Sequence, residues 1–177
     1  MKQESKERIA LSLRDFRLPR YQEIPNMGLY LDQAVKYMAE YLGPLGEYSL
    51  TSSMVSNYVK KGLIANPVKK QYSREQIAYL FFIAIAKSVL SLDALTGFIK
   101  LQHSTYPLPR AYDFFCETFE NLLLFTFELE DTVEVSMENS SDEKRLLFTC
   151  LAAAVQKVYL EKCLEAIALE KEEVQNG

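Results

Sequence analysis

Groups that carry catalysis are scarce in this sequence of 177 residues. Histidine, the commonest general base, occurs once, at His103, and no carboxylate or cysteine stands close to it in the sequence. The chain has no glycine-rich phosphate loop, no nucleophile elbow and no pair of metal-binding His or Cys residues. These absences argue against an enzyme, and we expect neither a cofactor nor a metal site.

Cysteines and long apolar runs are also few. Cys116, Cys150 and Cys163 are too scattered for a disulfide framework or a zinc site, so we expect ordinary buried thiols in a reducing cytoplasm. No apolar run reaches the roughly 18 residues that predict a membrane span. Residues 1–16 lack the apolar stretch of a secretion signal. A hydrophobic content of 49% still suffices for a folded core.

The net charge of −4 hides a division of the chain into a basic and an acidic part. Residues 1–110 hold 15 Lys and Arg against 9 Asp and Glu, a net charge of +6. Residues 111–177 hold 5 against 15, a net charge of −10. This division suggests two functions, and the basic part is the one expected to meet a polyanion.

Residues 50–72 combine the periodicity of an amphipathic helix with purely positive charge. Thr51 precedes two serines and predicts a helix start, and Gly62 can take the left-handed turn that ends a helix. The apolar face that must pack consists of Met54, Val55, Tyr58 and Val59. The opposite face carries hydroxyl, amide and ammonium groups, which bond base edges and phosphates.

Residues 49–74 contain five basic residues and no acidic one. After Gly62, short apolar runs around Asn66-Pro67 predict a small hairpin or an extended loop with two lysines at its tip, as in a wing. The predicted DNA-binding residues are Ser52, Ser53, Ser56, Asn57, Lys60, Lys61, Lys69, Lys70 and Arg74. A helix face of this kind, taken alone, is also typical of a solvated surface.

Helices predominate in the rest of the pattern. Residues 29–42 read as a helix that pairs with the one after Thr51 to form a helix-turn-helix. Ser73 and Ser91 begin two more helices, and we expect a shared core of Tyr58, Ile77, Leu80, Phe81 and Ile85. Residues 103–110 contain two prolines and read as a linker. The fold class is therefore all-α, with a small β-wing in a winged helix-turn-helix domain at residues 27–105.

The two ends of the chain extend this domain. Residues 1–26 are a lead and a basic arm with Arg14, Arg17 and Arg20. The arm either lies along a phosphate backbone or minor groove, or packs on its own domain. Residues 111–177 form an acidic helical unit for dimerisation or effector sensing. Its long helix is apolar on much of its circumference, so it covers the N-terminal core, pairs with a second copy to form a homodimer, or does both.

The segment SSMVSNYVKKGLIANPVKKQYSREQIAYLFFIAIAKSVLSLDAL is similar in layout to the DNA-binding domain of MerR-type regulators. The matching features are Tyr58, Gly62-Leu63-Ile64 at a helix end, Tyr72-Ser73 before the next helix, and Ser91-Leu92-Asp93 before the one after it. In that family the first helix pair grips DNA, a wing follows, and later helices lead to a dimerising coiled coil. The strings LPRYQEIPNMGLYLDQ, LTSSMVSNYVKKGLI and PVKKQYSREQIAYL resemble more closely a bacterial family labelled domain of unknown function 1836.

Two classes of function remain open at this point. The first is a cytoplasmic transcription regulator that binds double-stranded DNA as a homodimer through residues 111–177. The second is a protein–protein interaction module that uses the same fold without DNA. The absence of arginine from the reading helix favours this second class.

Overall fold

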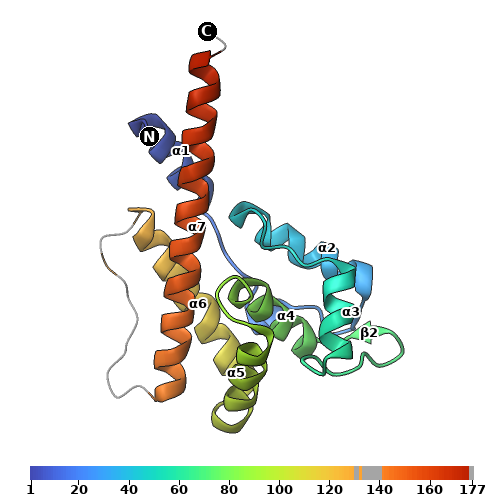
Figure 1. Ribbon diagram of the computed structural model, residues 1–177. Coiled ribbons are helices and arrows are strands. Elements are labelled where there is room, and N and C mark those ends of the chain that lie inside the picture. The colour runs from blue at the N-terminus through green and yellow to red at the C-terminus, as the bar shows by residue number, and fades with distance from the viewer. Residues whose placement is uncertain (130–131, 133–140, 176–177) are drawn as a thin grey trace.

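Helices make up most of the computed structural model, which describes residues 1–129, 132 and 141–175 (Figure 1). The α-helices are α1 (Gln3–Leu13), α2 (Leu31–Leu42), α3 (Ser52–Lys60), α4 (Arg74–Ala86), α5 (Leu92–Thr105), α6 (Leu108–Thr126) and α7 (Asp142–Gln175). In the part of the chain that is described, the strands β1 (Leu29–Tyr30) and β2 (Gln71–Tyr72) form one antiparallel sheet. The prediction of a mainly helical protein is confirmed.

Side-chain caps begin three of the helices where the sequence predicts them. The hydroxyl of Thr51 accepts a hydrogen bond from the backbone N–H of Met54 at 3.2 Å, at the start of α3. Ser73 caps α4 in the same way, and the side chain of Gln76 returns a bond to the N–H of Ser73 at 2.8 Å. Ser91 caps α5. Each cap satisfies an N–H group that the first helical turn leaves free.

Two element boundaries differ from those predicted. The predicted helix 29–42 begins at Leu31, because Leu29 and Tyr30 pair with β2 instead. The predicted linker 103–110 is mostly helical, since α5 continues to Thr105 and α6 begins at Leu108. Pro109 lies in the first turn of α6, where the missing N–H of proline costs nothing.

The core is centred on α4, which is apolar around its whole circumference. Every residue from Ile77 to Ala86 except Tyr79 is buried, and α4 contacts α6 and α7. The predicted core set, Tyr58, Ile77, Leu80, Phe81 and Ile85, is buried in one cluster, which confirms that prediction. The same cluster includes Phe119 of α6 and Leu151 of α7. Residues 111–177 thus cover the N-terminal core, as one of the predicted alternatives states.

The 34 residues of α7 span roughly 50 Å at 1.5 Å per residue. The N-terminal half of α7 packs against α4, α5 and α6. The C-terminal half runs beside α1 (Figure 1), where Glu170 accepts hydrogen bonds from the Ser5 hydroxyl at 2.5 Å and the Lys2 N–H at 2.7 Å. No helix in the described residues combines the length and hydrophobicity that crossing a membrane requires.

Replacing Leu80 by Ala tests the position of α4 in the core. Leu80 is 0% exposed, so we expect the free energy of unfolding to fall by about 2–5 kcal/mol in denaturant melts. Leu11 on α1 is 55% exposed and serves as a control, with an expected change of less than about 0.5 kcal/mol for Leu11→Ala. A loss below about 1 kcal/mol for Leu80→Ala would contradict the packing of α4.

Candidate nucleic-acid interface

The helix α3 buries one side and exposes a polar one. Val55 and Tyr58 are 0% and 8% exposed, and α3 packs on α2. The exposed side carries Ser53, Ser56, Asn57, Lys60 and Lys61, with Ser52 half-buried at its edge. Met54, predicted to pack, is 38% exposed, because it lies 100° around the helix from Val55 at the margin of the buried side.

Internal hydrogen bonds occupy two of the predicted hydroxyl groups. The Ser52 hydroxyl donates to Oδ1 of Asp32, at the start of α2, over 3.0 Å. The Ser56 hydroxyl donates to the carbonyl oxygen of Ser52 over 2.8 Å. The side chains of Ser53 and Asn57 form no hydrogen bond with any residue that the structure describes. Asn57 is therefore the exposed amide on α3 with both its donors and its acceptor available to a ligand.

The chain leaves α3 through the turn that Gly62 predicts. Gly62 has φ +72°, and the N–H of Leu63 bonds the carbonyl of Tyr58 at 2.9 Å. Leu63 and Ile64 then enter the core and fix the start of the loop that leads to β2. Figure 1 shows this loop projecting beyond α3, away from α7.

The loop returns as β2, whose main partner is β1. Leu29 pairs with Tyr72 and Tyr30 with Gln71, while Val68 bridges to Gln71 across a tight turn. Paired residues share a face of the sheet, so Tyr30, Gln71 and Val68 form a row on its outer side. Tyr30 and Val68 are 52% and 74% exposed. The segment predicted as a small hairpin or an extended loop thus ends in a tight turn, and the strand that follows pairs with β1.

Lys69 and Lys70 occupy the two central positions of this turn. Their φ angles are +51° and +65°, and the Gln71 N–H donates to the Val68 carbonyl at 2.9 Å. Two consecutive positive φ angles are typical of a type I′ turn, which favours Asn-Gly. A left-handed conformation costs roughly 1–2 kcal/mol for a residue with a Cβ. The turn thus holds two ammonium groups at the tip of the loop predicted to be a wing, in spite of backbone strain.

Arg74 lies apart from the other predicted site residues, because its guanidinium binds the N-terminal arm. Nε donates to the carbonyl of Ile24 and Nη1 to the side chain of Gln22, each at 2.8 Å. The guanidinium carbon also lies 5.6 Å from the ring centre of Tyr21. Arg74 therefore connects the start of α4 to the arm.

The arm packs within the protein, on Arg74 of α4 and also on α6, which belongs to the acidic unit predicted at residues 111–177. Arg20 forms a two-pronged ion pair with Glu120 of α6, with N–O distances of 2.7 and 2.6 Å, which raises the pKa of the Arg20 guanidinium. Glu120 also accepts the Leu18 N–H, and Asp113 accepts the Tyr21 N–H at 2.7 Å. Arg17 pairs with Glu23 within the arm.

Sequence reasoning missed two contributors to the surface around α3, namely Asp32 and the Tyr30–Val68 row. Asp32 places a carboxylate at one edge of the polar side of α3, although residues 49–74 themselves contain no acidic residue. The row depends on a sheet pairing between residues about 40 positions apart. The one signal of this pairing in the sequence is Gly28. Gly28 has φ +76°, and a Cβ there would lie 3.1 Å from the Gln71 Cβ. Glycine at this position marks a close approach of two backbones.

Replacing Lys69 by Asn and Lys70 by Gly tests the strain in the wing turn. Both new residues suit positive φ angles, so we expect the free energy of unfolding to rise by about 1 kcal/mol. The matched variant Lys69→Gln/Lys70→Gln removes the same charges but keeps the strain, and should change stability by less than about 0.5 kcal/mol. Equal stability of the two double variants in denaturant melts would contradict the strained turn.

Arg74→Ala tests whether this arginine fastens the arm. Loss of its hydrogen bonds should lower the free energy of unfolding by about 1–3 kcal/mol. Arg74→Lys keeps the charge but loses the fork geometry, so we expect it to restore less than half of that loss. Full recovery of stability with lysine would show that charge alone matters at this position.

Comparison with known proteins gives a family without an assigned activity. No curated protein and no solved structure matches the chain. Residues 19–115, more than half of the chain, match the family described as Domain of unknown function (DUF1836). The match covers most of the arm, α2 to α5, the sheet and the first part of α6. The chain therefore belongs to the family Domain of unknown function (DUF1836).

Proposed function

We propose that this protein is a transcription regulator that binds duplex DNA with α3 in the major groove and the Lys69-Lys70 turn on the adjacent backbone. Support comes above all from the wing turn, where two lysines occupy left-handed positions that favour Asn-Gly. Strain of this kind persists where the side chains serve a function. Similarity to the layout of MerR-type regulators supports the same arrangement.

Each exposed group has a defined role in this arrangement. The Asn57 amide pairs bidentately with the N6 and N7 edge of an adenine. Lys60 and Lys61 at the end of α3, with Lys69 and Lys70 on the wing, neutralise phosphates and release counterions. Arg74 acts only indirectly, because its guanidinium is bound to the arm. The Asp32 carboxylate faces the N-terminal end of α3 and directs the phosphate contacts toward the lysine end.

DNA binding is tested by selecting genomic fragments with the purified full chain and measuring affinities by fluorescence anisotropy. Lys69→Gln/Lys70→Gln should weaken binding to all sequences and reduce the salt slope by about 1.8, for two phosphate contacts. Asn57→Ala should instead relax specificity at one base position, because it loses about 1–3 kcal/mol of discrimination against the wrong base. Lys100→Gln on α5 is the control for loss of charge and should bind as the wild type does.

Failure of the wild-type chain to bind any genomic fragment at low salt would refute the DNA-binding proposal. A second reading, a protein–protein interaction module, then gains from the exposed apolar row. Met27, Tyr30 and Val68 are 84%, 52% and 74% exposed and belong to the segments around the sheet. Exposed apolar residues gathered near one element are typical of protein interfaces. Charge-removing variants of the lysines would leave such an interface largely intact.

Homodimerisation through α7 completes the proposal. The side of α7 opposite the core carries an apolar stripe, Leu146, Ala153, Leu160, Leu164 and Ile167, at spacings of seven, seven, four and three residues. Leu146, Leu160 and Leu164 are 51%, 57% and 56% exposed. This spacing is that of a helix seam that pairs with another helix. A twofold dimer would present two copies of α3 to two half-sites.

Leu160→Glu/Leu164→Glu tests the seam on α7. We expect the wild-type chain to sediment as a dimer at micromolar concentration and the double variant as a monomer, because each interface would bury two pairs of like charges. Leu11→Glu alters an equally exposed leucine on α1 and should remain dimeric. A monomeric wild-type chain in sedimentation equilibrium would rule out this dimer and the palindromic site that it implies.

A further inference from the structure

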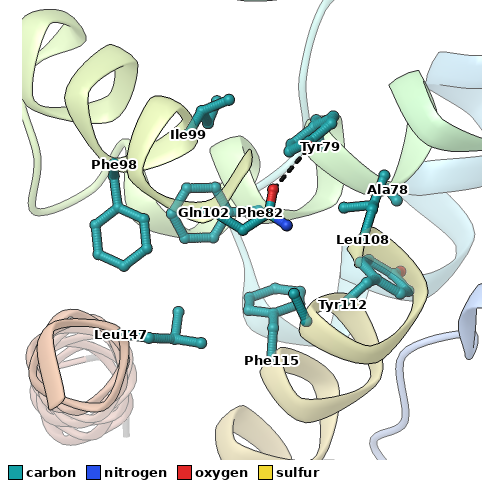
Figure 2. A pocket seen from close by; sticks show the side chains of 11 residues that line it. Ala78, Tyr79, Phe82, Phe98, Ile99, Gln102, Leu108, Tyr112, Phe115 and Leu147 are labelled. Atoms are coloured by element: carbon teal, nitrogen blue, oxygen red, sulfur yellow. Dashed lines mark hydrogen bonds between the residues drawn. The ribbon is translucent and has the colours of Figure 1, made fainter. Parts of the chain in front are cut away.

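A hollow lies where α4, α5, α6 and α7 meet, well away from α3 and the wing. Its inner part has a volume of about 50 Å³. Figure 2 shows Phe82, Phe98, Phe115 and Leu147 directed at this common space from four helices. The remaining residues that line it are Ala78, Tyr79, Ile99, Gln102, Leu108, Ala111 and Tyr112. The inner part is therefore an apolar and largely aromatic cleft.

A larger outer hollow of about 470 Å³ adjoins this cleft. The two share Phe98, Gln102, Ala111 and Leu147 as lining residues, so they lie next to each other. The outer walls add the rings of Tyr106 and Phe114 to five charged side chains. The outer volume falls within the 300–1,000 Å³ that is usual for small-molecule sites.

The polar group at the junction is satisfied within the protein. Gln102 accepts a hydrogen bond from the Tyr79 hydroxyl at 2.6 Å (Figure 2) and donates one to the Tyr106 carbonyl at 2.8 Å. A ligand group that enters the inner cleft thus meets ring faces and methyl groups, with no free amide to bond. The cleft selects an apolar group for this reason.

Two cations stand at the outer rim, and neither forms an ion pair with a residue that the structure describes. Arg110 comes from the first turn of α6, and Lys144 from the first turn of α7. Lys144 Nζ lies 4.9 Å from the Phe114 ring centre and 5.9 Å from that of Tyr106, and Arg110 lies 5.9 Å from Tyr106. Neither cation pairs with a carboxylate in residues 1–129 or 141–175. The N-terminal ends of two helices add positive potential at the same rim.

Three carboxylates also line the outer hollow, and two of them have partners. Asp113 accepts the Tyr21 N–H at 2.7 Å. Hydrogen bonding by Ser141 lowers the pKa of the Glu143 carboxyl in the first turn of α7. Glu117 is exposed one turn beyond Asp113. Asp113 and Glu143 are therefore less available to a ligand than Arg110 and Lys144, which pair with no carboxylate among the described residues.

We infer that this hollow binds a small amphipathic anion, with an aromatic or branched apolar body against the inner cleft and a carboxylate between Arg110 and Lys144. The apolar body is selected by the rings of Phe82, Phe98 and Phe115. The ligand carboxylate takes the place of the Tyr106 and Phe114 rings as the partner of the two cations. It also lies at the N-terminal ends of α6 and α7, where the helix dipoles are positive. The site is independent of DNA binding, since none of its residues belongs to α3 or the wing.

Three probes with the same body and different heads test the site on the full chain by isothermal titration calorimetry. They are 4-phenylbutyrate, 4-phenylbutyramide and 4-phenylbutylamine. We expect 4-phenylbutyrate to bind about tenfold or more tightly than the amide, because it forms charge-assisted hydrogen bonds. The amine should bind most weakly. Equal binding of the three, tightest binding of the amine, or no saturable heat with 4-phenylbutyrate would overturn the assignment.

Variants locate the binding within the hollow. Arg110→Gln/Lys144→Gln should weaken 4-phenylbutyrate about tenfold or more and leave the amide unchanged. Ala111→Leu places a larger side chain in both parts of the hollow and should abolish binding of all three probes. Lys100→Gln/Arg145→Gln removes two exposed charges outside the lining and should bind as the wild type does. Loss of 4-phenylbutyrate binding in this control and not in the Arg110/Lys144 pair would refute the site.

Discussion

The burial of α4 is the constraint on which the rest of this fold depends. A helix that is apolar on every side must be covered on every side, and the elements that cover α4 come from different parts of the chain. α3 and the sheet lie near its N-terminal end, while α6 and α7 cover its flanks. The surface predicted to meet DNA and the acidic helices are consequently parts of one core. A change that loosens α4 would affect both.

Local patterns in the sequence predict local structure well here. The capping residues Thr51, Ser73 and Ser91, the left-handed Gly62 and the polar side of α3 all follow from residue type and spacing within one helix. Contacts between residues far apart in the sequence cannot be predicted in this way from residue type and spacing. The partners of Arg20 and Arg74, which are Glu120 and Gln22, lie 100 and 52 residues away. The basic character of the arm therefore suggested a nucleic-acid contact, although Arg20 binds α6 within the protein.

The division of charge along the chain has a similar explanation in part. Two of the acidic residues after position 110, Asp113 and Glu120, bind the arm by accepting hydrogen bonds from its backbone and from Arg20. The opposite charges of the two parts thus attract one another within the molecule. The five lysines and arginines of residues 49–74 differ, because Lys60, Lys61, Lys69 and Lys70 remain exposed and only Arg74 is used internally. The structure distinguishes basic residues that bind other parts of the protein from basic residues that remain exposed, whereas the amino-acid composition does not.

The fastening of the arm to α6 has a consequence for biosynthesis. Arg20 leaves the ribosome 100 residues before its partner Glu120, a delay of roughly 5–20 s at 5–20 residues per second. During that interval the guanidinium and the Leu18 N–H lack Glu120, their partner in the folded protein. The interval between the synthesis of Ser5 and that of its partner Glu170 is longer, because Glu170 follows by 165 residues. The N-terminal part of the nascent chain therefore emerges with its arm undocked, and the arm reaches its final place only after α6 has been made.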